Sequence, residues 1–100
     1  MLGDRPMSEW IAQYSASHRH PVNRLLHTLG IPMIVVSLAL AAAGLAAPAL
    51  LLPAALLFVA GWVLQFLGHA VEGKRPEFFS DWRFLFVGLR WWVAKIRGRA

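Results

Sequence analysis

Residues 25–71 read LLHTLGIPMIVVSLALAAAGLAAPALLLPAALLFVAGWVLQFLGHAV and contain no aspartate, glutamate, lysine or arginine. One helix crosses the ~30 Å hydrocarbon core of a bilayer with ~20 residues, so this run of 47 residues is long enough for two passes and too short for three. A single unbroken helix of that length would measure ~70 Å, so the run must fold back on itself. Pro48 and Pro53 mark the expected turn. The run therefore predicts a transmembrane helical hairpin.

The overall composition agrees with a membrane protein. The chain has 100 residues, of which 58% are hydrophobic and 15% charged, and this is more apolar than a soluble domain of that size. Intrinsic disorder and a soluble nucleic-acid-binding domain are therefore disfavoured, and no nucleic-acid partner is expected. The absence of cysteine excludes disulfides, thiolate metal sites and cysteine nucleophiles. Residues 1–100 are expected to form a single all-α membrane domain.

Basic residues flank the charge-free run on both sides. Lysine and arginine are retained on the cytoplasmic side of a membrane, so both termini are predicted to be cytoplasmic and the protein to be multi-pass. The apolar stretch begins too late and is too long for a cleaved signal peptide, so none is expected. The flanking residues are Arg5, Arg19 and Arg24 before the run, and Lys74, Arg75, Arg83, Arg90, Lys95, Arg97 and Arg99 after it.

Four helices are expected along the chain. The two spans of the hairpin are placed at 23–46 and 53–71. In residues 6–17, apolar and aromatic side chains recur at positions i, i+3, i+4 and i+7, which predicts a short amphipathic helix lying on the membrane. Residues 81–97 combine five aromatic residues with three arginines spaced seven apart, which predicts an interfacial helix on an anionic leaflet. A helix packed within the protein is the alternative for residues 81–97.

Histidines supply the candidate functional residues. His27 and His69 lie equally far along the chain from Pro48 in the expected turn, so both should lie at the same depth, ~31 Å from the tip of the hairpin. His18 lies across an expected helix break near residue 20 and can fold back to the same place. Ionisable groups at membrane depth are costly to bury unpaired, so this convergence is a functional candidate.

Two interpretations of the three histidines remain open at this point. They bind a metal, since imidazole is the commonest metal-binding side chain, or they form a polar clasp between helices. His20 fits an interfacial residue best. Imidazoles without thiolates suit non-haem iron, zinc or manganese, and haem is a further alternative for paired histidines on two spans.

Nearby polar residues extend the candidate site. Glu72 follows His69 by three positions and therefore shares its helical face, where it is a possible fourth ligand or a hydrogen-bond acceptor for a ligand. The alternative for Glu72 is a salt bridge with Lys74, Arg75 or Arg24. Asn23 and Asp81 are the other candidates for metal binding or for support of the ligands.

Two motifs carry a resemblance to a known family. The first is HRHPVNRLLH at residues 18–27, followed by Gly-Ile-Pro at 30–32, and the second is GWVLQFLGH at residues 61–69, followed by Lys-Arg-Pro at 74–76. Together they resemble the small membrane 2-hydroxy fatty acid dioxygenases, iron-dependent enzymes of fatty acid α-oxidation and phytosphingosine breakdown. The alanine, leucine and arginine bias is similar to that of short bacterial members, which implies the bacterial inner (cytoplasmic) membrane.

The resemblance implies that His18, His27 and His69 bind Fe(II) and are catalytic, and that a 2-hydroxy fatty acid loses one carbon in a reaction with O₂. On this interpretation Arg24, Lys74 or Arg75 holds the substrate carboxylate at the cytoplasmic interface, and the acyl chain lies among the apolar side chains of the spans. The alternatives are a non-catalytic membrane hairpin or assembly subunit with structural histidines, and a haem-binding membrane protein. A small hairpin in the lipid bilayer also leaves surface for a homo-oligomer.

Overall fold

The computed structural model describes residues 3–98 and is all-helical over that range, which confirms the predicted fold class. Its four α-helices are connected by short segments that include two 3₁₀ turns, and the described residues form no strand. In chain order the elements are α1 (Met7–Ala16), α2 (Pro21–Gly44), η1 (Pro48–Leu50), α3 (Leu51–Glu72), η2 (Glu77–Phe79) and α4 (Phe84–Ile96).

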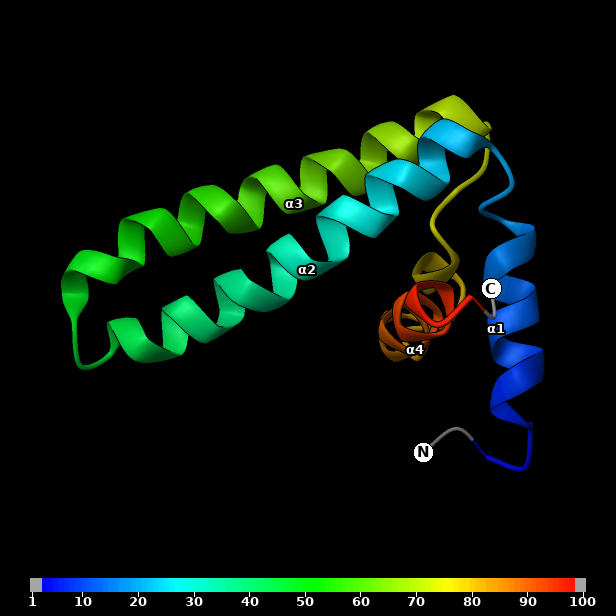
Figure 1. Cartoon of the computed structure of the whole chain (residues 1–100), viewed down its shortest axis with the longest axis horizontal. Helices are drawn as coiled ribbons and strands as arrows, with labels where there is room; N and C mark the ends of the chain where they lie inside the picture. Colours follow the sequence, from blue (N-terminus) through cyan, green and yellow to red (C-terminus); the bar gives the residue numbers. More distant parts are fainter. Residues whose placement is uncertain (1–2, 99–100) are drawn as a thin grey trace.

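Helices α2 and α3 form the antiparallel hairpin that extends away from the rest of the molecule (Figure 1). Both are long and apolar enough to cross a membrane. Helix α2 begins at Pro21, earlier than the predicted 23, because a proline suits the first helical position and the His20 ring accepts a hydrogen bond from the Val22 backbone N–H at 3.1 Å. Pro53 lies in the first turn of α3, where a missing N–H costs nothing, and not in the connection.

The two hairpin helices meet along small residues spaced seven apart. A Cβ atom added to Gly61 would lie 3.1 Å from the carbonyl oxygen of Gly30, so the two backbones are in close contact there. A seven-residue repeat keeps one face of each helix toward its neighbour, and small side chains allow that close approach inside a membrane. The buried residues of this repeat, the small-residue seam, are Asn23, Gly30, Ser37 and Gly44 of α2 and Ala54, Gly61 and Gly68 of α3.

Helices α1 and α4 pack against each other beside one end of the hairpin only (Figure 1). Their shared core contains Trp10, Tyr14, Phe84, Val87 and Trp91. Trp10 and Phe84 contact edge to face, with ring centroids 5.1 Å apart. The buried face of α4 is therefore that of a packing helix, the alternative that the sequence left open, while its opposite face exposes Leu85, Phe86 and Leu89.

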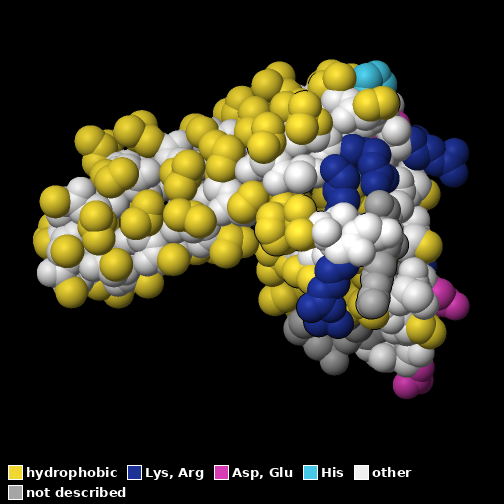
Figure 2. Space-filling view, viewed as in Figure 1, with side chains coloured by type: hydrophobic (Ala, Val, Ile, Leu, Met, Phe, Trp, Pro, Cys, Tyr) yellow, Lys and Arg dark blue, Asp and Glu magenta, His cyan; other side chains and the backbone are white. Residues whose placement is uncertain are grey.

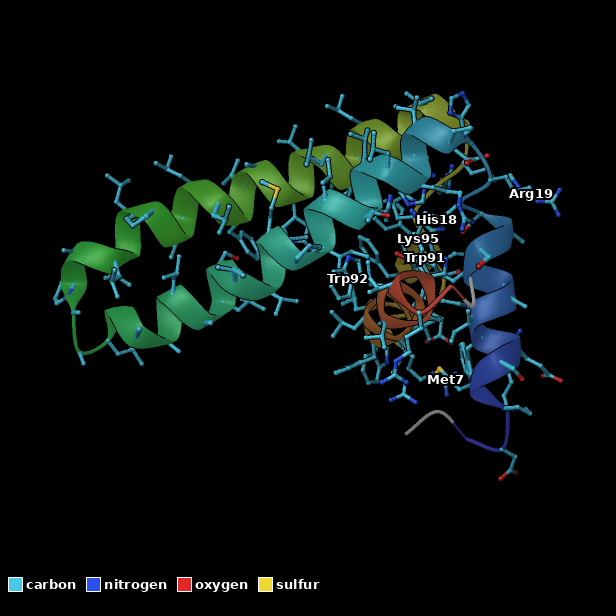
Figure 3. All side chains as sticks on the ribbon, viewed as in Figure 1. Met7, His18, Arg19, Trp91, Trp92 and Lys95 are labelled. Atoms are coloured by element: carbon cyan, nitrogen blue, oxygen red, sulfur yellow. The ribbon has the colours of Figure 1, made fainter. Side chains whose placement is uncertain are left out.

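Pro32 helps to attach α4 to α2. A proline inside a helix has no N–H, so the carbonyl of Thr28, four residues earlier, loses its usual helical donor. The Trp92 indole N–H donates to this carbonyl at 2.9 Å, and the Lys95 ammonium donates to the Thr28 hydroxyl at 2.7 Å. Figure 3 shows Trp92 and Lys95 on the side of α4 that lies beside α2. Two hydrogen bonds thus fix α4 on the hairpin.

The surface divides along the length of the molecule. Figure 2 shows hydrophobic side chains over the extended arm of the hairpin, while lysine and arginine side chains gather at the other end, around α1 and α4. Leu45 near the tip is 87% exposed. An apolar arm with a basic end is the distribution expected of a hairpin that crosses a bilayer from its basic side.

Candidate metal centre

The structure brings His18, His27 and His69 together at the end of the hairpin where α1 and α4 pack. His18 follows α1, His27 lies in the second turn of α2 and His69 lies in the last turn of α3. All three are buried, and one nitrogen from each lies within 4.8 Å of the others. The three imidazoles thus meet at one point although they come from separate segments of the chain.

Backbone carbonyls fix the tautomers of two of these histidines. The Nδ1 of His18 lies 2.6 Å from the carbonyl oxygen of Tyr14, and the Nδ1 of His27 lies 3.1 Å from the carbonyl oxygen of Asn23. A carbonyl can only accept, so each Nδ1 carries the proton and each Nε2 keeps a lone pair. A backbone carbonyl bound to the far nitrogen is the usual support of a metal-ligating histidine.

The two unprotonated nitrogens face each other. The Nε2 atoms of His18 and His27 are 3.0 Å apart, and with both protons held at Nδ1 neither can donate to the other. Two lone pairs that face each other at this distance repel. A proton or a metal ion between the two Nε2 atoms would remove this repulsion. Two imidazole nitrogens bound to one ion at ~2.1 Å and at right angles lie ~3.0 Å apart, so the observed separation fits a shared ion.

Burial disfavours an additional proton on His18, because it destabilises the charged imidazolium. Burial, with a smaller contribution from the nearby His69, lowers the pKa of His18 to about 4, against the opposing effect of the Tyr14 carbonyl. His18 is therefore neutral at pH 7. Because the buried site disfavours a proton between the two Nε2 atoms, the geometry is better suited to a metal ion at that position.

The core shared by α1 and α4 holds His18 in place. The Tyr14 ring stacks on the His18 ring with centroids 4.1 Å apart and planes 14° from parallel. The Trp91 ring lies 5.8 Å from His18 on another side, and Figure 3 shows both residues between α1 and α4. His18, the candidate ligand that lies outside the hairpin, is thus positioned by aromatic packing as well as by its hydrogen bond to Tyr14.

Glu72 and Asn23 lie beside the histidines and support the chain around them. The Glu72 carboxylate accepts hydrogen bonds from the His20 backbone N–H at 2.6 Å and from the Asn23 amide at 3.3 Å. The same Asn23 amide nitrogen lies 3.4 Å from the Ser17 carbonyl oxygen. These bonds tie the connection between α1 and α2 to the end of α3, so the structure gives Glu72 this role in place of a salt bridge.

The other residues predicted for the site are spread more widely. Arg24 donates to the His18 carbonyl at 3.3 Å, and its guanidinium lies 5.5 Å from the centroid of the Trp91 ring, so it is adjacent to the histidines. Lys74 donates to the Ala16 carbonyl at 3.2 Å, and Arg75 is exposed. Asp81 pairs with Arg83 at 2.8 Å, which holds the pKa of its carboxyl below the usual range, and it does not join the histidines.

A cavity of about 290 Å³ adjoins the histidines. It lies between the hairpin, η2 and α4, and its lining is almost entirely apolar. Its polar lining residues are His27, His69, Gln65, Tyr14 and Glu77. Burial raises the pKa of the Tyr14 hydroxyl, which therefore stays protonated. Sequence reasoning missed Tyr14 and Glu77 as cavity residues, because their places depend on how η2 and α1 dock.

Comparison with known proteins identifies a family model that matches almost the whole chain. The family model described as 2-hydroxy-palmitic acid dioxygenase Mpo1-like matches residues 5–100. No curated protein and no solved structure matches the chain.

Proposed function

Because the chain belongs to the Mpo1-like family, we propose that it is an Fe(II)-dependent dioxygenase that shortens 2-hydroxy fatty acids by one carbon. His18, His27 and His69 are the proposed iron ligands. The hairpin is proposed to lie in the bacterial cytoplasmic membrane with both termini on the cytoplasmic side, so that the site lies at that interface.

The observation that carries this proposal is the pair of facing Nε2 atoms, 3.0 Å apart, whose protons are held at the opposite ring nitrogens. A purely structural clasp would place a donor against an acceptor at this point. Three buried imidazoles with one nitrogen each within 4.8 Å of the others match the chemistry of a metal site, and an all-nitrogen set without thiolates suits iron.

The proposed reaction consumes one O₂ for each 2-hydroxy acid and gives the acid one carbon shorter, CO₂ and water. The bond between carbons 1 and 2 breaks, carbon 2 becomes the new carboxyl carbon, and O₂ accepts four electrons. Bound Fe(II) supplies open coordination positions at which the substrate and O₂ can meet. No organic cofactor is required for this electron balance.

The protein's part is to bind and orient the substrate. Arg24 is the cation best placed for the carboxylate, because it already contacts the His18 carbonyl, whereas Lys74 is held on the end of α1. The apolar lining beside His27 and His69 is proposed to exclude water from the reacting end of the substrate. The lipid bilayer delivers the fatty acyl substrate.

The test compares purified wild type with His18→Ala, His27→Ala and His69→Ala after anaerobic loading with Fe(II). His20→Asn is the matched control, because His20 is exposed and asparagine retains the helix cap. Near-stoichiometric iron without a haem absorption band, and conversion of 2-hydroxypalmitic acid under O₂, are expected in wild type and control. Both should be lost in the three alanine variants.

Well-folded wild-type protein that takes up no Fe(II) would overturn the proposal in favour of a structural hairpin. A haem band in the purified protein would overturn it in favour of a haem protein.

A further inference from the structure

We propose that the cavity is an acyl groove that begins at the histidines, runs along the hairpin and opens to the lipid at its far end. The inference rests on the proposed function for the identity of its ligand, a fatty acid that carries a polar group at one end. It assigns the place of the tail, which the position of the histidines alone leaves open.

One wall of the groove is a single stripe of α2. His27, Ile31, Ile34 and Leu38 all line the cavity, and they follow one another at spacings of four, three and four residues. That spacing keeps side chains on one face of a helix. The stripe therefore runs unbroken from a proposed metal ligand toward the tip, over ~16 Å of helix.

The opposite wall is a matching stripe of α3. His69, Gln65, Trp62 and Phe58 line the cavity at the same spacings in reverse order. Each lies as far from Pro48 as its counterpart on α2, so the two antiparallel stripes form four successive layers. The first layer is the histidine pair, whose ring centroids are 4.8 Å apart.

Polarity changes once along these layers. The layers nearest the iron site contain His27, His69 and Gln65, and the last two layers are formed by isoleucine, leucine and aromatic side chains. The Gln65 amide nitrogen is buried without a hydrogen-bond partner. A ligand with a polar head and one apolar tail fits this order in one direction only, with its head at the histidines.

The far end of the groove is open. Leu38 is 57% exposed and Phe58 is 40% exposed, and both lie on the arm that is proposed to be surrounded by lipid. A tail longer than the groove can therefore continue into the bilayer. We expect no sharp upper limit on chain length, and 2-hydroxy acids of 16 and 24 carbons should be converted at similar rates.

Two adjacent valines provide a matched pair of variants. Val35 and Val36 are 45% and 49% exposed, but only Val35 lines the cavity. Val35→Trp should fill the groove, and Val36→Trp should place the same ring in lipid. Neither residue contacts the proposed iron site, so both variants should load Fe(II) as wild type does.

The experiment uses a 2-hydroxy fatty acid with a photoreactive diazirine near the end of its tail, bound to the full-length protein in lipid nanodiscs. Cross-links are expected at residues 34–38 and 58–62, and Val35→Trp should reduce them at least tenfold while Val36→Trp leaves them unchanged. The ratio of activity on 2-hydroxypalmitic acid to activity on 2-hydroxyhexanoic acid should fall by a similar factor in Val35→Trp alone.

The outcomes separate the groove from the reaction. Cross-links in the groove without turnover of any 2-hydroxy acid would retain the groove and overturn the proposed activity. Turnover with cross-links spread evenly over the lipid-facing residues, or equal effects of the two tryptophan variants, would overturn the groove and retain the activity.

Discussion

The two ends of the hairpin are built from the same two helices and the same small-residue seam, yet among the described residues the buried histidines gather at one end. At the histidine end, α1 and α4 add a third layer, and His18, Asn23 and His27 are almost completely buried. At the tip the helices have no such cover, and Leu45 is 87% exposed. The flanking helices, and not the hairpin alone, therefore turn one end into a candidate site.

The largest expected effect comes from removing the third layer. Trp91 is completely buried between α1 and α4, so Trp91→Ala should cost about 3–5 kcal/mol of stability and also weaken metal binding by displacing His18. Trp82→Ala is the control, because Trp82 is 57% exposed on the same aromatic-rich segment. Thermal unfolding in detergent measures the stability of the two variants. Equal losses of stability in Trp91→Ala and Trp82→Ala would show that the histidine end does not depend on this core.

Acid should weaken the histidine end selectively. The pKa of His18 is lowered to about 4 by burial, so between pH 6.5 and 4 the unfolded chain binds more protons than the metal-free native protein. Stability is therefore fully present above pH 6.5 and falls as the pH drops through this window, by about 3 kcal/mol for His18. Denaturation curves of the metal-free wild type and of His18→Gln at pH 7 and pH 4 measure this loss of stability. An identical pH dependence in the two proteins would contradict the prediction.

Adding one methyl group to the seam should distinguish its two ends. A Cβ on Gly30 would overlap the Gln65 amide and lie 3.0 Å from the Gly61 carbonyl oxygen, so Gly30→Ala should destabilise by about 1–3 kcal/mol. A Cβ on Gly44 would overlap the Leu51 side chain at Cδ2 and Cγ but lie 3.5 Å from the Leu51 backbone nitrogen, and because Leu51 is 44% exposed its side chain can move, so Gly44→Ala should cost less than about 1 kcal/mol. Unfolding in a denaturing detergent measures the loss of stability in each variant. A larger loss for Gly44→Ala than for Gly30→Ala would show that the two helices pack more tightly at the tip.

The smallest effect is expected on the lipid-facing side of the tip half. Leu56 is 62% exposed, so Leu56→Ala should change stability by no more than about 0.5 kcal/mol and leave iron content unchanged. A larger loss that depends on protein concentration would instead indicate that a second copy covers this face, as the predicted homo-oligomer would. Detergent-denaturation curves at two protein concentrations provide the measurement.

The sequence predicted the hairpin and the meeting of the histidines because both follow from one-dimensional features. The charge-free run sets the number of spans, and the equal distances of His27 and His69 from Pro48 set their common depth. The seam was not predicted, although its small residues recur at every seventh position of the sequence, because which helical faces meet is visible only in the folded hairpin. The helix boundaries shifted by a few residues because prolines at 21 and 53 occupy first turns.

The remaining features depend on the docking of distant segments. Asp81 was predicted as a further candidate for the metal site, but its carboxylate pairs with Arg83, two residues away. Glu77 enters the cavity wall because η2 turns back toward α1, where the Gln13 amide donates to its carboxylate at 3.3 Å. No spacing rule connects residues 13 and 77, so these neighbours become visible only in three dimensions.

Pro32 also gives the protein an order of biogenesis. Until α4 docks on α2, the Thr28 carbonyl lacks its helical donor, because Pro32 has no N–H. Trp92 supplies the missing N–H, and α4 is synthesised after both spans. The docking that satisfies this carbonyl also seats Trp91 beside His18. Formation of the hairpin and assembly of the candidate metal centre are thereby separable, because the packing around His18 depends on α4 and the contact between α2 and α3 does not.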